Sequence, residues 1–224
     1  MSRTNLMLSV AVVFGTVQVA SAAVVSGTAN QDGFELLDPA PAAVGNDNQQ
    51  QSKLFAFDED QNIILPSTLT LGSAFTTNTQ YQYTIAAGTV VASHYVFFDP
   101  AGTASINGSV TFDATILGVA ADTDDLANTD FLANNSVTYN NPQLRGIETV
   151  ETFNGVAQDS FFISGATLNV DFTASTPGDY LRVFTAQSPG GPDPLPPVPL
   201  PAPALLLIGG LGALGALRRP RQRG

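Results

Sequence analysis

Over residues 23–187 the chain alternates between apolar and polar positions with a period of two in several short segments. This alternation is typical of β-strands that place one face on a core and the other in water. Residues 110–116 and 168–173 show it most clearly, whereas residues 89–98 are almost continuously apolar. The continuous run predicts a central strand that is covered on both faces. Shorter strands are predicted at residues 53–57, 69–71, 81–85, 161–164 and 180–185.

Turn-forming residues lie between the predicted strands. Tight turns are predicted at Asn107-Gly108, Asn154-Gly155, residues 99–102 and residues 176–179. Residues 122–132 are expected to form a short helix or an ordered loop, and residues 38–51 a long polar loop. Many short strands separated by turns predict an all-β fold, namely an antiparallel β-sandwich of jelly-roll or immunoglobulin-like type.

The first 22 residues have the features of a secretory signal peptide. Arg3 supplies a basic start, and residues 6–19 are mostly apolar. Ala20 and Ala22 place small side chains before a cleavage site at Ala23. We therefore expect the chain to be exported and residues 1–22 to be removed.

The other end of the chain combines a short motif, an apolar run and a basic stop. The motif is Val198-Pro199-Leu200-Pro201-Ala202, in which a Pro-rich linker at residues 188–201 meets the apolar run. Residues 202–217 carry no charge and would span about 24 Å as a helix, somewhat less than the ~30 Å hydrocarbon core. The basic residues behind this run, which act as a stop-transfer signal, are Arg218, Arg219, Arg221 and Arg223. The pattern predicts a transmembrane helix at 202–217 and a cytoplasmic tail at 218–224.

Together, these features of residues 198–219 resemble the VPLPA-CTERM variant of the PEP-CTERM sorting signals, which occur on exported proteins of Gram-negative bacteria. The resemblance implies a transient stay in the inner membrane and cleavage near the motif by an exosortase-type membrane protease. It also implies that the body then reaches the cell surface or the extracellular space. Such systems tend to accompany exopolysaccharide production, so a matrix or biofilm role, with exopolysaccharide as a partner, is implied as well.

Removal of both ends would change the charge balance of the chain. Five of the eight basic residues lie in these ends and all 19 acidic residues lie between them, so the remaining part has a formal charge of −16, against −11 for the whole chain. Its basic residues, Lys53, Arg145 and Arg182, are too few and too scattered for a nucleic-acid-binding patch. Since cysteine is absent, the body of about 165 residues must be stabilised by its hydrophobic core rather than by disulfides.

One histidine and two groups of carboxylates are the candidates for chemistry. His94 lies within the apolar run of residues 89–98, which predicts a structural position beside the core, and a single histidine excludes a histidine-rich zinc site. Ca²⁺ takes six to eight oxygen ligands. The acidic residues that could supply them are Asp58 and Asp60 in one group and Asp122, Asp124, Asp125 and Asp130 in the other. For each group the alternative is a solvated acidic loop that binds no metal. In the second group, Asp124 and Asp125 could instead cap a short helix.

The sequence therefore favours an exported, non-catalytic surface or matrix protein with no cofactor other than a candidate Ca²⁺. Two alternatives stay open. A Ca²⁺-dependent carbohydrate-binding module would stack sugars on strand tyrosines such as Tyr81, Tyr83 and Tyr95. A carboxylate-based hydrolase would need two acids ~5–9 Å apart across a cleft, and the sequence does not place them.

Overall fold

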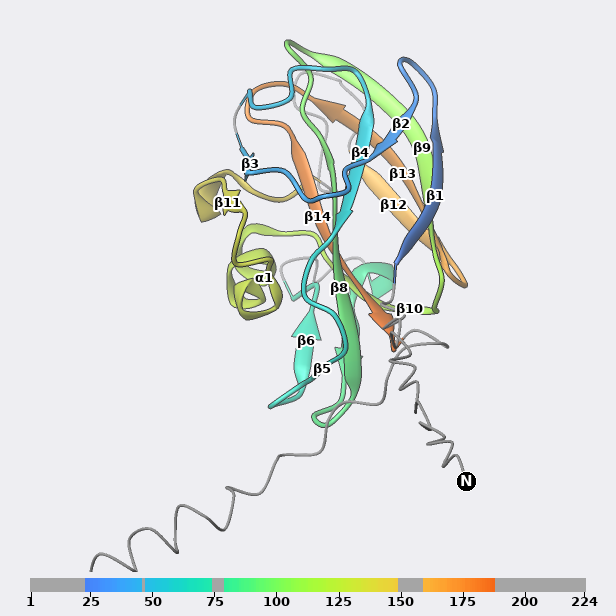
Figure 1. Cartoon of the computed structure of the whole chain (residues 1–224), viewed down its shortest axis with the longest axis vertical. Coiled ribbons are helices and arrows are strands. Elements are labelled where there is room, and N and C mark those ends of the chain that lie inside the picture. The colour runs from blue at the N-terminus through green and yellow to red at the C-terminus, as the bar shows by residue number, and fades with distance from the viewer. Residues whose placement is uncertain (1–22, 46, 74–78, 149–158, 188–224) are drawn as a thin grey trace, which may run out of the picture. The chain divides into compact units, whose positions relative to one another are not determined.

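The computed structural model describes residues 23–45, 47–73, 79–148 and 159–187, and these form an all-β domain with two main sheets (Figure 1). The four-stranded sheet has the spatial order β1 (Val24–Ala29), β9 (Ala104–Phe112), β13 (Thr167–Ala174) and β12 (Ser160–Ser164). The six-stranded sheet has the order β10 (Ile116–Ala120), β14 (Asp179–Ala186), β8 (Val90–Phe98), β4 (Leu54–Asp58) and β2 (Phe34–Leu36), and β5 (Ile63–Ile64) also pairs with β8. All pairs in these sheets are antiparallel except β2 with β4, which is parallel.

Short elements lie beside the six-stranded sheet on the side away from β1 and β9 (Figure 1). Two of these are small sheets, formed by β3 (Ala43–Val44) with β11 (Thr138–Tyr139) and by β6 (Leu69–Leu71) with β7 (Tyr83–Ile85). The helical elements on this side are α1 (Thr123–Asn128), η2 (Asp130–Leu132) and η3 (Pro142–Leu144), whereas η1 (Thr79–Tyr81) lies near β12, where Tyr81 packs against Phe161. The short helix expected within residues 122–132 is therefore confirmed as α1, followed by η2.

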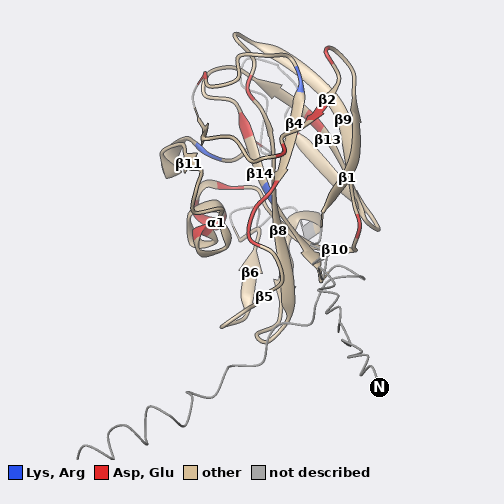
Figure 2. Cartoon of the chain, in the orientation of Figure 1, with Lys and Arg blue, Asp and Glu red and all other residues tan. Residues whose placement is uncertain are grey.

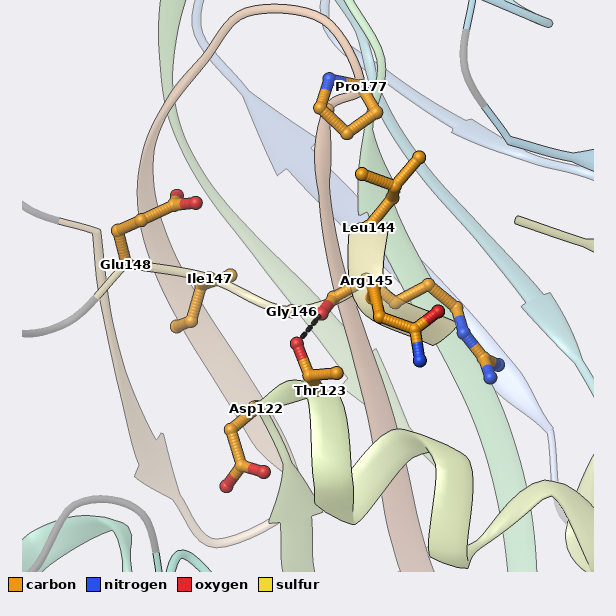
Figure 3. A pocket seen from close by; sticks show the side chains of 10 residues that line it. Asp122, Thr123, Leu144, Arg145, Gly146, Ile147, Glu148 and Pro177 are labelled. Atoms are coloured by element: carbon orange, nitrogen blue, oxygen red, sulfur yellow. Dashed lines mark hydrogen bonds between the residues drawn. The ribbon is translucent and has the colours of Figure 1, made fainter. Parts of the chain in front are cut away.

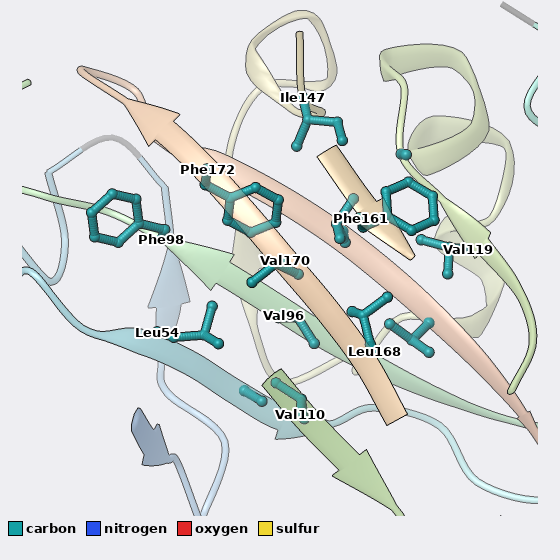
Figure 4. Packing of buried hydrophobic residues seen from close by; sticks show 14 of the residues in the cluster. Leu54, Val96, Phe98, Val110, Val119, Ile147, Phe161, Leu168, Val170 and Phe172 are labelled. Carbon is teal, nitrogen blue, oxygen red and sulfur yellow. The ribbon is translucent and has the colours of Figure 1, made fainter. Parts of the chain in front are cut away.

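The main core lies between the two sheets (Figure 4). The six-stranded sheet contributes Leu54, Val96 and Phe98, and the four-stranded sheet contributes Val110 and Phe172, among others. All five are at most 2 % exposed, because alternate residues of each strand point to the same face. Burial of this apolar surface is the main source of stability in a domain without cysteine.

A second core lies on the opposite face of the six-stranded sheet. Phe55, Tyr95 and Phe97 pack there against Leu126 of α1 and Leu132 of η2. Strand β8 is thus covered on both sides, since Val96 and Phe98 face one core while Tyr95 and Phe97 face the other. This confirms the central strand predicted from the continuously apolar run.

The strand predicted at residues 110–116 is wrong in its extent. Strand β9 ends at Phe112 and β10 begins at Ile116, so the segment belongs to two strands in different sheets. The bend occurs at Asp113, whose Oδ1 accepts a hydrogen bond from the Ala23 N–H at 3.1 Å. The apolar alternation continues through the bend because Ala114 is buried as well, and so the pattern alone does not reveal it.

The hairpin turn predicted at Asn107-Gly108 is also wrong. Both residues lie inside β9, where Gly108 is opposite Ala29 of β1 and Val170 of β13. A Cβ atom at Gly108 would lie 2.5 Å from the backbone oxygen of Thr28. Glycine is needed here for the close approach of a neighbouring strand, which is its other common role in a sheet.

Two further loop predictions have different outcomes. Residues 38–51 are not wholly a polar loop, because they contain β3, whose Val44 is buried against the second core. The turns at residues 99–102 and 176–179 are confirmed as the connections β8–β9 and β13–β14, although β14 already begins at Asp179. Asn154-Gly155, the signal peptide, the linker and the C-terminal helix lie outside the described residues.

Candidate functional site

His94, the only histidine, lies on the core-facing side of β8 with no solvent exposure. Its Nδ1 lies 2.7 Å from Oδ1 of Asp58, and its Nε2 lies 3.0 Å from Oγ1 of Thr185, which is also buried. This order of carboxylate, imidazole and hydroxyl resembles the connectivity of a catalytic triad. However, a nucleophile must reach its substrate, and the Thr185 hydroxyl is enclosed. These contacts indicate that His94 joins β4, β8 and β14, in agreement with the structural position predicted for it.

A buried ion pair lies on the other face of the six-stranded sheet. Arg182 of β14 donates from Nε to Oε2 of Glu59 at 2.7 Å and from Nη2 to Oε1 at 3.0 Å, and neither side chain is exposed. Ser93 and Tyr139 also donate their hydroxyl groups to the Glu59 carboxylate. Burial and the nearby Glu59 charge raise the pKa of the Tyr139 hydroxyl, so that it remains a donor. Glu59 thus has four donated hydrogen bonds to compensate the cost of burying its charge.

The same network reaches the helical elements that cover this face. Arg182 donates from Nη1 to the carbonyl oxygen of Leu126, to Oγ1 of Thr129 and to Oδ1 of Asp130. Asp130 in turn forms two 2.8 Å hydrogen bonds with the guanidinium group of Arg145. Burial alone would raise the pKa of Asp130, but the two guanidinium groups outweigh it and lower the pKa below its usual value. This network fixes α1 and η2 on the six-stranded sheet.

The first carboxylate group predicted as a Ca²⁺ candidate is divided between the two faces of the sheet. Asp58 lies beside His94 and accepts the Val24 N–H, whereas Glu59 points to the opposite face towards Arg182. Burial, and then the Glu59 charge, raise the pKa of Asp60. Successive side chains at the end of a strand point to opposite faces of the sheet, so these neighbouring carboxylates are separated.

The second group is divided among three local roles. Asp122 caps α1, with its Oδ1 accepting the Asp125 N–H at 2.9 Å, so the capping residue is Asp122 rather than Asp124 or Asp125. Asp125 is buried and accepts the Gly72 N–H, while Asp124 is exposed and Asp130 pairs with the arginines. The described structure does not bring either predicted group together at distances that suit a shared metal ion.

A different set of carboxylates does come together. Glu148 follows η3, Asp159 immediately precedes β12 and Asp179 is the first residue of β14. One oxygen of each carboxylate lies within 4.8 Å of the others. Within the described residues they are the one group of three acidic, histidine or cysteine side chains with this geometry. Asp159 and Asp179 are buried, with exposed fractions of 3 % and 2 %, while Glu148 is exposed.

Repulsion and burial act together on this acidic triad. Burial raises the pKa of Asp179 to about 9, with further contributions from the charges of Asp159 and Glu148. Burial likewise raises the pKa of Asp159 to about 7, although the backbone N–H groups of Thr173 and Glu148 oppose the rise. The body has few cations to balance such a group, as the distribution of acidic and basic residues shows (Figure 2).

A surface pocket of about 220 Å³ lies next to the acidic triad. Its walls include Asp122 and Thr123 at the start of α1, the segment from Gln143 to Glu148, and the turn residues Pro177 and Gly178. Figure 3 shows the hydroxyl of Thr123 donating to the carbonyl oxygen of Arg145, which holds the two walls together. Glu148 is therefore accessible from the pocket.

The predicted sorting residues lie mostly outside the described structure. Of the residues assigned to signal cleavage, Ala23 alone is described, and it is followed directly by β1. No helix within residues 23–187, leaving aside the undescribed segments, is long and apolar enough to cross a membrane.

Comparison of the chain with protein-family models, curated proteins and solved structures found no match.

Sequence reasoning missed the acidic triad because its members are far apart in the chain and each stands alone among other residue types. One signal was present: Asp179 directly precedes the apolar residues of β14 and follows a turn. A single acidic residue at the start of a buried strand can become buried when the two sheets pack together.

Proposed function

We propose that this chain is an exported, non-catalytic surface or extracellular-matrix protein that is sorted, and cleaved near its C-terminus, by an exosortase-type membrane protease. The observation that carries the proposal is the order of the motif at residues 198–202, the apolar run at 202–217 and the arginines from Arg218 onward. Proline favours extended backbone over helix, and a motif with two prolines would therefore be accessible to a protease. Exopolysaccharide is the proposed partner at the surface.

The beginning of the β-domain supports removal of the signal peptide before Ala23. Strand β1 starts at Val24, and the Ala23 nitrogen lies 3.1 Å from Oδ1 of Asp113. After cleavage this nitrogen becomes a charged α-amino group, and its hydrogen bond to Asp113 becomes an ion pair. This contact would stabilise a chain that begins at Ala23.

The charge of the body supports a role as a soluble surface domain rather than a nucleic-acid-binding one. Each of its three basic side chains is already paired, Lys53 with Glu35, Arg145 with Asp130 and Arg182 with Glu59. The other acidic residues that the structure describes are spread over the domain (Figure 2). A large net negative charge favours solubility and repels other anions.

For the fold, we propose the jelly-roll alternative over the immunoglobulin-like one. The chain crosses between the two sheets at the connections β8–β9, β9–β10 and β13–β14, whereas β12 and β13 form a hairpin within one sheet. Repeated crossing between two packed antiparallel sheets supports a double-sheet jelly roll. The carbohydrate-binding alternative has less support, because Tyr81 and Tyr95 are buried and only Tyr83 of the proposed stacking residues is partly exposed.

The sorting proposal is tested with two double variants of the full-length chain in the producing cell. The first variant alters the motif and carries Pro199→Ala and Pro201→Ala. The matched control carries the same type of substitution in the linker, Pro194→Ala and Pro196→Ala. Fractionation and immunoblotting measure how much of the body stays in the membrane. We expect the motif variant to accumulate there while the wild type and the linker variant are released. Equal release of all three would contradict the proposal.

A further inference from the structure

The acidic triad of Glu148, Asp159 and Asp179 lies where the ends of the two main sheets meet. Asp159 immediately precedes β12 at one edge of the four-stranded sheet. Asp179 belongs to β14 of the six-stranded sheet, opposite Phe98 of β8. The carboxylates therefore come from different layers of the domain, and an ion held between them would connect the sheets.

Among the described residues, Asp179 has no hydrogen-bond or ion-pair partner that accounts for its burial. Its exposed fraction is 2 %, and its Oδ2 is buried without a hydrogen bond. Asp159 is already engaged: its Oδ1 accepts the Thr173 N–H at 2.7 Å and its Oδ2 accepts the Glu148 N–H at 3.1 Å. An unpaired buried carboxylate beside a second buried one is costly unless a cation or a proton compensates for it.

The domain has no basic side chain free to supply that compensation. Lys53, Arg145 and Arg182 are the basic residues of the body, and each is bound to a carboxylate outside the triad. Arg145 and Arg182 each lie three positions from a member of the triad, but Arg145 directs both terminal nitrogens to Asp130 and Arg182 donates to Glu59. The residues that shift the pKa of Asp179 by their charge are acidic, and none of them lowers it. A compensating cation must therefore come from outside the described domain.

We propose that Glu148, Asp159 and Asp179 bind one Ca²⁺ ion that joins the two sheets at this end of the domain. Two oxygens bound to the same Ca²⁺ at about 2.4 Å are at most ~4.8 Å apart, which agrees with the spacing of the triad. The ligand set consists of oxygens alone, which suits a hard cation and not zinc or copper. Water completes the six to eight ligands on the open side, where Glu148 borders the pocket.

The rival explanation is a proton shared among the three carboxyl groups. It needs no metal, and it also removes the repulsion between neighbouring acids. The two explanations differ in their response to Ca²⁺, because a proton-sharing cluster gains nothing from added Ca²⁺ at fixed pH. They also differ in the effect of Asp179→Asn, which imitates the protonated acid but removes a ligand and a charge from a cation site.

The test uses the full-length chain, stripped of metal with a chelator and then titrated with CaCl₂ or MgCl₂. Calorimetry measures binding, and thermal unfolding measures stabilisation. For a site with a dissociation constant of roughly 10⁻⁴ to 10⁻³ M, ~10 mM Ca²⁺ should raise the ratio of folded to unfolded protein about 10- to 100-fold. Asp179→Asn should lose this response, and Glu148→Gln, at an exposed position that does not endanger folding, should weaken Ca²⁺ binding.

The matched control is Asp171→Asn, which removes one exposed carboxylate from the neighbouring strand β13. It should keep the full response to Ca²⁺. An unchanged unfolding midpoint of the wild type at ~10 mM Ca²⁺ overturns the proposal in favour of the shared proton. An equal response to Mg²⁺, or an Asp179→Asn variant that responds to Ca²⁺ like the wild type, overturns it as well.

Discussion

Arg182 and Glu59 form a two-point ion pair, with contacts of 2.7 and 3.0 Å, although they are 123 positions apart in the chain and neither side chain is exposed. Glu59 follows β4 and Arg182 lies in β14, so the pair spans the intervening strand β8. The guanidinium carbon lies over the ring of Tyr95 in β8, 5.5 Å from the ring centroid. The pair thus connects three strands with the helical elements that cover them.

Glu59→Gln should destabilise the domain strongly. The substitution leaves the Arg182 charge buried without its main partner, and breaking a buried pair in this way costs about 3–5 kcal/mol of unfolding free energy. Glu35→Gln is the matched control, because the Lys53–Glu35 pair is 30 % and 42 % exposed and such pairs contribute roughly 1 kcal/mol or less. Urea unfolding of both variants measures the difference. Similar losses for the two would show that the buried network does not stabilise the domain.

Gly108→Ala should be destabilising because two strands approach closely there, and not because of the tight hairpin turn that the sequence predicts. The added Cβ would lie 2.5 Å from the Thr28 oxygen, and β1 would have to move away from β9. Overpacking of this kind costs about 1–3 kcal/mol. Gly102→Ala is the control, since no atom lies within 4 Å of its added Cβ and the residue lies in the β8–β9 turn. Equal midpoints for the two variants would contradict the close approach.

The apolar pattern predicted most strands because it reports which residues face a core. It predicted β8, β13 and β14 well, since these strands are long and regular. It did not locate the bend at Asp113, because the apolar alternation continues through the bend and resembles that of a single strand. It also did not show the role of Gly108, because Asn-Gly inside a strand reads like the Asn-Gly of a hairpin turn. Those features depend on which strands become neighbours.

The candidate sites were harder to predict for the same reason. Asp58-Glu59-Asp60 reads as one acidic cluster, yet strand geometry sends Glu59 to Arg182 and Asp58 to His94. The acidic triad, by contrast, is assembled from three separate connections and has no local spacing to recognise. The local sequence pattern therefore predicted the acidic cluster at residues 58–60, which the fold separates. It did not predict the acidic triad, which the fold brings together.

Asp125 should make the stability of the domain fall as the pH rises from about 4 to 7. Burial, with the nearby charges of Asp122 and Asp124, raises the pKa of Asp125 to about 7 from its ordinary value of 3.8. The stabilising contribution of the protonated form is complete below the unfolded-state pKa and is lost as the pH passes the folded-state pKa. Asp125→Asn keeps an acceptor for the Gly72 N–H but cannot ionise.

The variant should therefore gain stability relative to the wild type as the pH rises, with the difference levelling off above pH ~7. Unfolding measured at a series of pH values tests this. Asp124→Asn serves as the control, because that carboxylate is exposed on the same helical turn. A constant difference between Asp125→Asn and the wild type across this range would show that Asp125 is ionised throughout.

The most direct test of the proposed sorting is the intact mass of the mature protein isolated from the producing cell. We predict a chain that begins at Ala23 and ends near the motif at residues 198–202, without the apolar run and the arginines. A modification at the new C-terminus would add to this mass and would itself indicate transfer to a surface component. A mature chain that still ends at Gly224 would show that residues 202–217 are a permanent anchor and that the motif is not a processing signal.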